Sequence, residues 1–222
     1  MTADAIRALR EDGRVWFRDA LTQNELAGMD STCAVGSAPG LRLSLCDVGD
    51  SLKPVHRLAA QVLPGAVPVR LVAFNKSEAS NWSLPWHQDR VIAVRERVEV
   101  PGYANWTRKS GVWHVEPPIE LLQRMIFARV HLDAATAENG CMELALGSDA
   151  LGKVPETAAE PIANDPEQRR EFCVAERGDV LFVRALTLHR SRASQKSGER
   201  RALRIDYAAE QLPAPLEWEF ST

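Results

Sequence analysis

Residues 178–191 read GDVLFVRALTLHRS, and the expected architecture is built around this stretch. Gly178 and Asp179 predict a turn, after which residues 180–185 form an apolar run typical of a buried strand. His189 arrives directly after this strand, with Ser191 beyond it. A histidine in such a place is more often a hydrogen-bonded structural residue than a metal ligand, so both interpretations stay open until other motifs are considered.

Other short strands, separated by turns, surround this run. The expected strands are rich in β-branched and large apolar residues and lie at residues 67–74, 125–132, 141–146, 171–175 and 202–208. Strands at this spacing, with little helix between them, favour a β-sandwich or a small barrel. We therefore expect a mostly β core from residue 67 to residue 222.

The first 66 residues predict a helical preface to that core. Residues 3–11 carry apolar side chains at helical spacing, and residues 15–17 predict a short strand. Thr22 and Glu25 form a Thr-x-x-Glu capping box, which predicts the start of a second helix. Because the sequence shows no repeat and no interdomain linker, residues 1–222 are expected to form a single domain.

Two stretches interrupt the expected strands. Residues 82–120 hold four of the six tryptophans together with four prolines, which is too long and too proline-rich for one strand. We expect a functional lid or wall there, the alternative being aromatic filler beneath a long loop. Residues 149–170 are polar and hold three prolines, which predicts a surface loop.

The composition excludes several classes of protein. Lys and Arg total 27 against 30 Asp and Glu, which gives a formal net charge of −3, and 45% of the residues are hydrophobic. These values exclude a disordered chain, a collagen and an obligate nucleic-acid coat. The N-terminus mixes acids and bases, and no apolar run reaches membrane-spanning length, so we expect a cytoplasmic protein without a nucleic-acid or membrane partner.

The four cysteines, Cys33, Cys46, Cys141 and Cys173, are scattered without any CxxC spacing. This scatter argues against a thiolate zinc site and against a disulfide framework. Buried free thiols are therefore expected.

Three His-x-Asp/Glu spacings offer candidate metal ligands. Residues i and i+2 of an extended strand point the same way, so this spacing supplies two of the ligands that a two-histidine, one-carboxylate iron site needs. About 0.7 such spacings are expected by chance from this composition, so each match is weak on its own. The three pairs are His87 with Asp89, His114 with Glu116 and His131 with Asp133.

The three pairs differ in how well a role without metal explains them. His131 ends a strand on which Arg129 and Asp133 share its face, so a polar lining accounts for that pair. The pair at 114 and 116 lies among tryptophans just before two prolines, where a role in the lid is the better interpretation. His87 and Asp89 follow a Pro-Trp corner and rank first of the three.

Residues 198–208, GERRALRIDYA, predict a strand with cationic side chains on one face. Arg200, Arg204 and Asp206 share that face, whereas Arg201 falls on the apolar face. Guanidinium groups that are buried or that face a pocket need an anion, and arginine suits bidentate binding of a carboxylate. The alternative is a structural ion pair with Asp206 or a neighbouring acid.

Taken jointly, these motifs resemble the phytanoyl-CoA dioxygenase-like branch of the Fe(II)/2-oxoglutarate-dependent oxygenases. The resemblance rests on WHQDR at residues 86–90, HLDAATAENGCMELALGSD at 131–149, GDVLFVRALTLHRS at 178–191 and GERRAL at 198–203, in the family's order. The stretch EDGRVWFRDALTQNEL at residues 11–26 also fits. The motifs are specific together, although each is unspecific alone.

The resemblance implies a double-stranded β-helix, which is a jelly-roll, cupin-like core, with flanking N-terminal helices. It implies that His87, Asp89 and His189 bind Fe(II), and that Arg200 binds the distal carboxylate of 2-oxoglutarate, with Arg201 and Arg204 as the alternatives. The further candidates are Lys76 and Asn75 for the co-substrate, and Trp86, Trp113, His131 and Arg129 for the substrate pocket.

The resemblance also implies a reaction in which O2 and 2-oxoglutarate are co-substrates, and succinate and CO2 are co-products. Family members that halogenate lack the carboxylate ligand, so Asp89 favours hydroxylation of a small molecule that the sequence does not identify. One departure is the family's Pro-Gly-Ser-His turn, which reads Leu-Gly-Ser-Asp at residues 146–149. That histidine is not an iron ligand in the family, so the implied ligand set stays complete.

Two alternatives compete with this function. A cupin-like metal-dependent isomerase or hydrolase would not use 2-oxoglutarate and would recruit His131 as a further ligand. A barrel without catalysis would keep the site for sensing or scaffolding. Formation of succinate separates the oxygenase from both.

Overall fold

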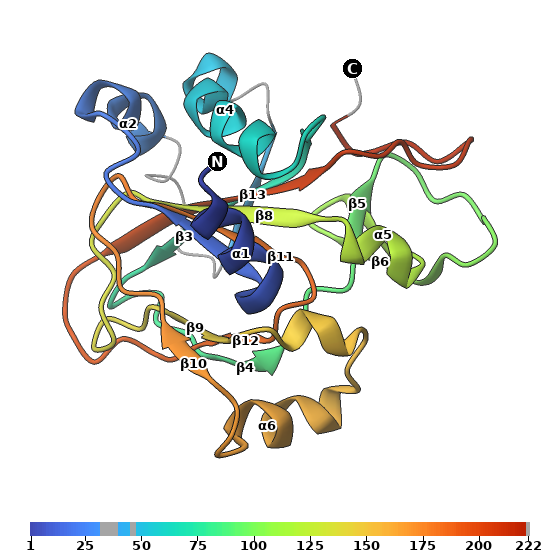
Figure 1. Cartoon of the computed structure of the whole chain (residues 1–222). Helices are drawn as coiled ribbons and strands as arrows, with labels where there is room; N and C mark the ends of the chain where they lie inside the picture. Colours follow the sequence, from blue (N-terminus) through green and yellow to red (C-terminus); the bar gives the residue numbers. More distant parts are fainter. Residues whose placement is uncertain (32–39, 45–47, 221–222) are drawn as a thin grey trace.

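Two antiparallel sheets form the centre of the molecule, which the computed structural model describes for residues 1–31, 40–44 and 48–220 (Figure 1). The larger sheet has the order β1 (Arg14–Phe17), β11 (Val180–Arg184), β8 (Ile126–His131), β13 (Arg200–Ala208), β3 (Val67–Lys76) and β2 (Leu41–Leu43). The smaller sheet has the order β10 (Arg170–Phe172), β9 (Met142–Ala145), β12 (His189–Ser191) and β4 (Leu84–His87). The chain passes repeatedly between the two sheets, which is the topology of a double-stranded β-helix, so the expected fold class is confirmed.

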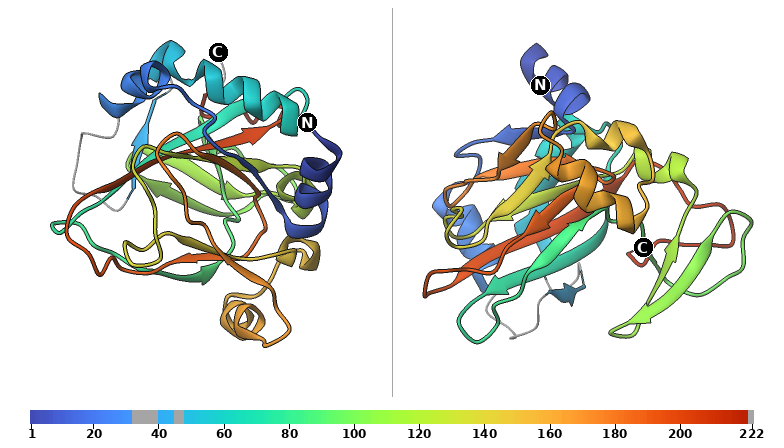
Figure 2. Two further views of the ribbon diagram at one scale, coloured as in Figure 1. Left: turned by 60° about the vertical axis from the view of Figure 1, so that its left-hand side comes forward. Right: turned by 90° about the horizontal axis from the view of Figure 1, so that it is seen from below.

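Helices cover the outer face of the larger sheet, as the two views of Figure 2 also show. These helices are α1 (Ala3–Asp12), α2 (Gln23–Asp30) and α4 (Lys53–Val62), the last preceded by the 3-10 turn η2 (Gly49–Leu52). Both helices predicted before residue 31 are present, and Thr22 and Glu25 form the predicted capping box. Leu26 and Val55 are fully buried against strand residues such as Phe182. Burial of each such side chain contributes about 1.5–3 kcal/mol to stability.

The inner face of the larger sheet carries buried cations, beside an apolar cluster that includes Phe127 and Leu181. On β8, Ala128 and Val130 belong to the helix-covered core, whereas Arg129 alternates with them and lines a cavity on the opposite face. On β13, Leu203 and Ile205 belong to the same core, and the arginines at 200 and 204 line the cavity. The alternation predicted from the sequence therefore separates core from cavity on both strands.

Residues 82–120, expected as a lid or wall, do not form one irregular segment. They begin with β4 and continue into a three-stranded sheet of β5 (Ile92–Val94), β7 (Val112–Glu116) and β6 (Ala104–Lys109), followed by α5 (Ile119–Gln123). In the right-hand view of Figure 2 this sheet projects to one side of the barrel. Its buried residues, among them Ile92, Val94 and Val115, pack with Leu212 and Trp218 in a second core. The segment is therefore an added sheet with its own core.

The prediction of a surface loop at residues 149–170 is wrong. This stretch overlaps the 3-10 turn η3 (Ser148–Leu151) and contains the helix α6 (Glu156–Asn164). Pro161 lies inside α6, although proline usually ends a helix. Ala159 and Ala163 are buried on one side of α6 and pack with Trp86 of β4. This packing stabilises a helix that its polar, proline-rich sequence did not indicate.

Cys141 and Cys173 are buried free thiols, as predicted, while Cys33 and Cys46 lie outside the described residues. None of the helices in the described ranges combines the length and the apolar character needed to span a bilayer.

Candidate functional site

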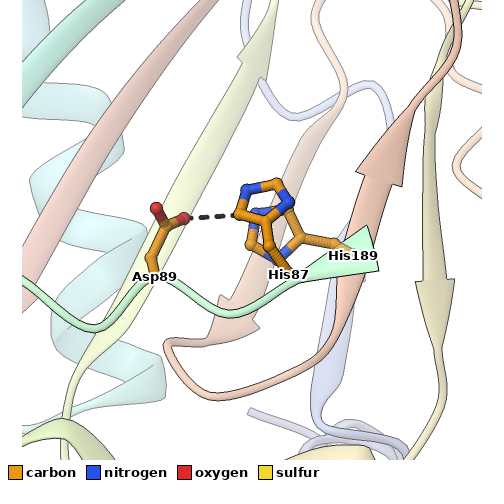
Figure 3. Close-up of side chains that lie close together, drawn as sticks. All are labelled: His87, Asp89 and His189. Carbon is orange, nitrogen blue, oxygen red and sulfur yellow. Dashed lines mark ion pairs between the residues drawn. The ribbon is translucent and has the colours of Figure 1, made fainter. Parts of the chain in front are cut away.

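The two predicted histidine ligands meet because β4 and β12 are neighbours in the smaller sheet. His87 at the end of β4 is the register partner of His189 at the start of β12, and their ring centroids lie 4.3 Å apart. Asp89 follows β4 by two residues, so its side chain returns to the side of His87. One ligand atom from each of His87, Asp89 and His189 falls within a group no wider than 4.8 Å (Figure 3). The structure thus brings the three predicted ligands together.

Backbone carbonyls orient both imidazoles in the same way. Nδ1 of His87 lies 2.8 Å from the carbonyl oxygen of Pro85, and Nδ1 of His189 lies 2.9 Å from that of Thr187. A carbonyl only accepts, so each Nδ1 carries a proton and donates it, which leaves Nε2 as the nitrogen that can bind a metal. A hydrogen bond from the ring nitrogen that does not bind the metal is the usual way in which proteins orient a histidine ligand.

The close approach of His189 to Asp89 fits a cation site. Nε2 of His189 lies 3.1 Å from Oδ2 of Asp89, so two electron-rich atoms face each other and require a proton or a metal ion between them. Burial, together with the neighbouring His189, lowers the pKa of His87 to about 4, which keeps that imidazole neutral. Two imidazoles and one carboxylate form the donor set that non-haem Fe(II) uses.

A chain of ion pairs holds the carboxylate of Asp89. Nη1 of Arg204 contacts Oδ2 of Asp89, and Nε of Arg204 lies 2.7 Å from Oδ1 of Asp206. Arg70 completes the chain, with Nε 2.6 Å from Oδ2 of Asp206. Burial raises the pKa of Asp89, but Arg204 and His189 outweigh it, so the pKa of this carboxyl lies well below its usual range. Asp89 is therefore ionised and fixed in place.

A cavity of about 180 Å³ opens in front of the three predicted ligands. Both sheets line this cavity. Among the described lining residues, Asp89 is acidic and six are arginines. The other lining side chains of the described chain come from β2, β3, β8, β9, β12 and β13 and from the segment before β4, and they include Arg42, Arg70, Phe74, Trp82, Arg129, Met142, Arg190, Ser191, Arg200 and Arg204. The cavity is suited to a small, negatively charged molecule.

Arg200 stands in this cavity without a counter-ion. It is 2% exposed, and its Nε and Nη1 have no hydrogen-bond partner in the described part of the chain. The two alternative arginines already form ion pairs. Arg201 pairs with Asp133 and Asp30 on the outer face, and Arg204 pairs with Asp89. A buried guanidinium with unsatisfied donors is costly, so this arginine fits the role of an anion ligand.

Of the two further co-substrate candidates, Lys76 lies beside Arg200 and Asn75 faces away. Lys76 is the register partner of Arg200, is 1% exposed, and its Nζ donates to Oγ of Ser191 at 3.0 Å. Burial, with a contribution from Arg200, lowers its pKa to about 7. Asn75 precedes Lys76 on β3, so its side chain points to the opposite face of the sheet. Its Nδ2 donates to Oε1 of Glu199 at 3.4 Å.

Three of the four pocket candidates do not line this cavity. Trp86 alternates with His87 on β4 and packs on α6, and Trp113 belongs to the added sheet, where its ring meets that of Trp106 edge to face. His131 packs on Trp16 with ring centroids 5.8 Å apart, and neither of its nitrogens has a partner among the described residues. Arg129 does line the cavity.

The sequence interpretation placed residues 82–120 in a lid or wall but did not single out Trp82, which lines the cavity. Its ring is 6.4 Å from that of Phe74, and Nζ of Lys76 lies 5.1 Å from its centroid. Alternation along β4 does not identify it, because Trp82 precedes that strand. His114, from the second His-x-Glu pair, instead accepts a hydrogen bond from Nε of Arg42 at 3.2 Å.

Comparisons with known proteins agree with this geometry. Residues 34–202 match the model of the family Phytanoyl-CoA dioxygenase (PhyH). No curated protein matches the chain. Among solved structures, the non-heme alpha ketoglutarate dependent carbocyclase SnoK from nogalamycin biosynthesis is 17% identical with a TM-score of 0.68, over 94% of this chain and 84% of that chain.

Two further solved structures share the fold. AviO1 from Streptomyces viridochromogenes Tue57 is 20% identical with a TM-score of 0.62, over 96% of this chain and 95% of that chain. HygX from Streptomyces hygroscopicus, with nickel, 2-oxoglutarate and hygromycin B bound, is 14% identical with a TM-score of 0.63, over 94% and 87%. The family match spans more than half of this sequence and includes His87, Asp89, His189 and Arg200. The chain therefore belongs to the phytanoyl-CoA dioxygenase family of iron- and 2-oxoglutarate-dependent enzymes.

Proposed function

We propose that this chain hydroxylates a small molecule, with O2 and 2-oxoglutarate as co-substrates and succinate and CO2 as co-products. One observation carries the proposal: the His87, Asp89 and His189 cluster faces the same cavity as the unpaired guanidinium of Arg200. The cluster provides a site for Fe(II), and the arginine provides a site for an anion beside it. A cavity with both features suits a metal-chelating dicarboxylate.

Each of the four site residues has a defined role in this proposal. His87 and His189 offer Nε2 to Fe(II), since their Nδ1 protons are held by carbonyls. Asp89 supplies the third ligand as an ionised carboxylate. Arg200 binds the C5 carboxylate of 2-oxoglutarate through bidentate hydrogen bonds. When bound, Fe(II) would supply the redox chemistry that couples oxidation of 2-oxoglutarate to oxidation of a substrate C–H bond.

The walls of the cavity orient the reactants and limit the access of water. Phe74, Trp82 and Met142 supply apolar surface, while Arg200 and Ser191 lie at its polar end. A rigid, closed surrounding protects a reactive centre from side reactions. The similar structures solved with nogalamycin RO and with hygromycin B contain small molecules, which supports a small-molecule substrate for this chain as well.

The cupin-like isomerase or hydrolase is less well supported. That alternative needs His131 at the metal, but His131 is stacked on Trp16 and lies outside the cluster of His87, Asp89 and His189. The unpaired Arg200 would also have no role without a carboxylate ligand. Both observations favour an enzyme that uses 2-oxoglutarate.

An anaerobic titration with Fe(II) and 2-oxoglutarate tests the site. We expect the weak visible charge-transfer band of an Fe(II) complex with a 2-oxo acid, and we expect His189→Ala and Asp89→Ala to lose it. A wild-type band and affinity in either variant would show that these residues are not the ligands.

Product mass tests the reaction type. With a panel of candidate small molecules, succinate release identifies a substrate, and hydroxylation then adds one oxygen atom to its mass. The names of similar structures include a carbocyclase and an epimerase. A product that has lost two hydrogens, or one of unchanged mass, would replace hydroxylation by cyclisation or epimerisation.

A further inference from the structure

Arg129 is a second buried arginine in the cavity, and nothing in the proposed function uses it. It lies on the inner face of β8, is 7% exposed and lines the same cavity as His87 and Arg200. Its Nε has no hydrogen-bond partner in the described residues, and no acidic side chain of those residues pairs with it.

Most other arginines that line the cavity are paired with acids. Arg190 donates to Glu143 at 2.7 Å, Arg204 pairs with Asp89 and Asp206, and Arg70 pairs with Asp206 at 2.6 Å. Arg42 is partly exposed and donates to the neutral ring of His114. Among the described residues, Arg129 and Arg200 are thus buried cavity arginines that lack a carboxylate.

The strand register puts Arg129 level with Arg204, and a ring contact shows that its side chain reaches towards Arg200. Its register partner on β13 is Arg204, the residue that contacts Asp89. Its guanidinium carbon lies 5.2 Å from the ring centroid of Phe74 on β3, which is the register partner of Ala202. The side chain therefore crosses β13 over the small Ala202, from the level of Asp89 towards the level of Arg200.

Two unpaired guanidinium groups in one cavity repel each other. Burial, followed by the nearby charge of Arg200, lowers the pKa of Arg129 to about 9. Such an arrangement is costly in a low-dielectric surrounding unless anions enter it. A dianion would neutralise the charges of Arg129 and Arg200 together and so remove this repulsion.

We propose that Arg129 and Arg200 together bind the two carboxylates of 2-oxoglutarate. Arg200 takes the C5 carboxylate, and Arg129, whose strand position is level with Arg204 beside Asp89, takes the C1 carboxylate. This inference rests on the proposed use of 2-oxoglutarate and adds a residue to it. The cavity then selects dicarboxylates before any metal is bound, because the protein itself supplies one cation for each carboxylate.

Binding of glutarate and pentanoate to chelator-treated protein, measured by calorimetry, tests the pair. The two ligands have the same carbon number and differ in one carboxylate, and neither has the 2-oxo group. We expect wild-type protein to bind glutarate at least tenfold more tightly than pentanoate. In Arg129→Met this preference should disappear while the affinity for pentanoate stays within about twofold, because that ligand still meets Arg200. A preserved preference in Arg129→Met would overturn the inference.

Thermal unfolding of the ligand-free protein separates binding from a structural role. Arg129→Met removes an uncompensated buried charge, so the midpoint should stay equal to that of the wild type or rise. Arg204→Met is the matched control, because it replaces the register partner and removes a cation that pairs with both Asp89 and Asp206. We expect its midpoint to fall. An equal fall in Arg129→Met would assign Arg129 a structural role instead.

Titration of the iron-loaded protein with 2-oxoglutarate distinguishes a failure of this inference from a failure of the proposed function. If wild-type protein with Fe(II) and 2-oxoglutarate gives no charge-transfer band, the proposed function itself fails. If the band forms with the same 2-oxoglutarate dissociation constant in wild type and Arg129→Met, the function stands and Arg129 is not a co-substrate ligand.

Discussion

The guanidinium of Arg204 contacts the carboxylate of Asp89, and this pair joins the larger sheet to the loop after β4. Oδ2 of Asp89 also lies 3.1 Å from Nε2 of His189, so Arg204 and His189 contact the same carboxylate oxygen. A residue that holds a metal ligand in this way sets both its charge and its position.

Replacing Arg204 by Met should therefore affect stability and metal binding together. Removal of the cation leaves Asp89 and Asp206 without their shared partner, which costs about 3–5 kcal/mol of unfolding free energy. We expect Fe(II) affinity to fall about 10–100-fold, as for other residues that support metal ligands. Urea unfolding and an anaerobic Fe(II) titration measure the two effects. A stable variant with normal affinity would show that the contact is dispensable.

Arg200→Gln should weaken 2-oxoglutarate binding without a large loss of stability. The buried guanidinium has no acidic partner to leave behind, whereas its loss removes the charge that meets a carboxylate. The dissociation constant should rise by a factor that corresponds to about 2–5 kcal/mol. Arg201→Gln is the control, since Arg201 pairs with Asp133 and Asp30 on the other face. A larger effect in Arg201→Gln would reverse the assignment.

The choice between Arg200 and its neighbours shows how far strand patterns carry a prediction. Alternation along residues 200–208 separated cavity from core because both faces are buried and differ in polarity. The same rule, applied to β4, excludes Trp86 from a cavity that His87 faces. Trp113 could not be placed in this way, because its position depends on how a separate sheet packs. The helix α6 was missed for a similar reason, since its stability comes from contact with Trp86.

Lys76 should make the ligand-free protein more stable as the pH rises. Its pKa of about 7 in the folded protein lies below its ordinary value, so between about pH 7 and pH 10 the unfolded chain binds the extra proton. The unfolding free energy therefore gains on the order of 4 kcal/mol across this window, and the gain is absent below pH 7. Urea unfolding at pH 6.5 and pH 9 should show the gain in wild type and its loss in Lys76→Met.

An exposed lysine provides the control for this pH effect. Lys53 pairs with Asp50 at the surface, and its side chain is 63% exposed. Lys53→Met should keep the same difference between pH 6.5 and pH 9 as wild type. If Lys76→Met also keeps it, another group causes the pH dependence.

His131→Phe should leave metal content and 2-oxoglutarate turnover unchanged. The imidazole is buried against Trp16, has no hydrogen-bond partner among the described residues and lies outside the three-residue cluster. A phenyl ring of similar shape removes two unsatisfied polar atoms, so stability should stay equal or rise. Metal analysis and succinate assays measure the outcome. Loss of bound iron in this variant would revive the cupin-like alternative.

Gly13 links α1 to β1 at a position that no other residue fits. Its φ is +73°, and a Cβ there would lie 2.5 Å from Oδ1 of Asp149 and 2.7 Å from Oγ1 of Thr187. Gly13→Ala should therefore cost more than the roughly 1 kcal/mol typical of a left-handed backbone alone. Because Thr187 O holds the ring of His189, we also expect weaker metal binding.

Gly111→Ala separates the backbone effect from the steric one. Gly111 has a φ of +85°, and a Cβ there would meet nothing within 4 Å. Chemical unfolding of both variants should show a clearly larger loss for Gly13→Ala, and metal binding should weaken in that variant alone. Equal losses would mean that backbone strain, rather than the crowded contact with Asp149 and Thr187, makes glycine necessary between α1 and β1.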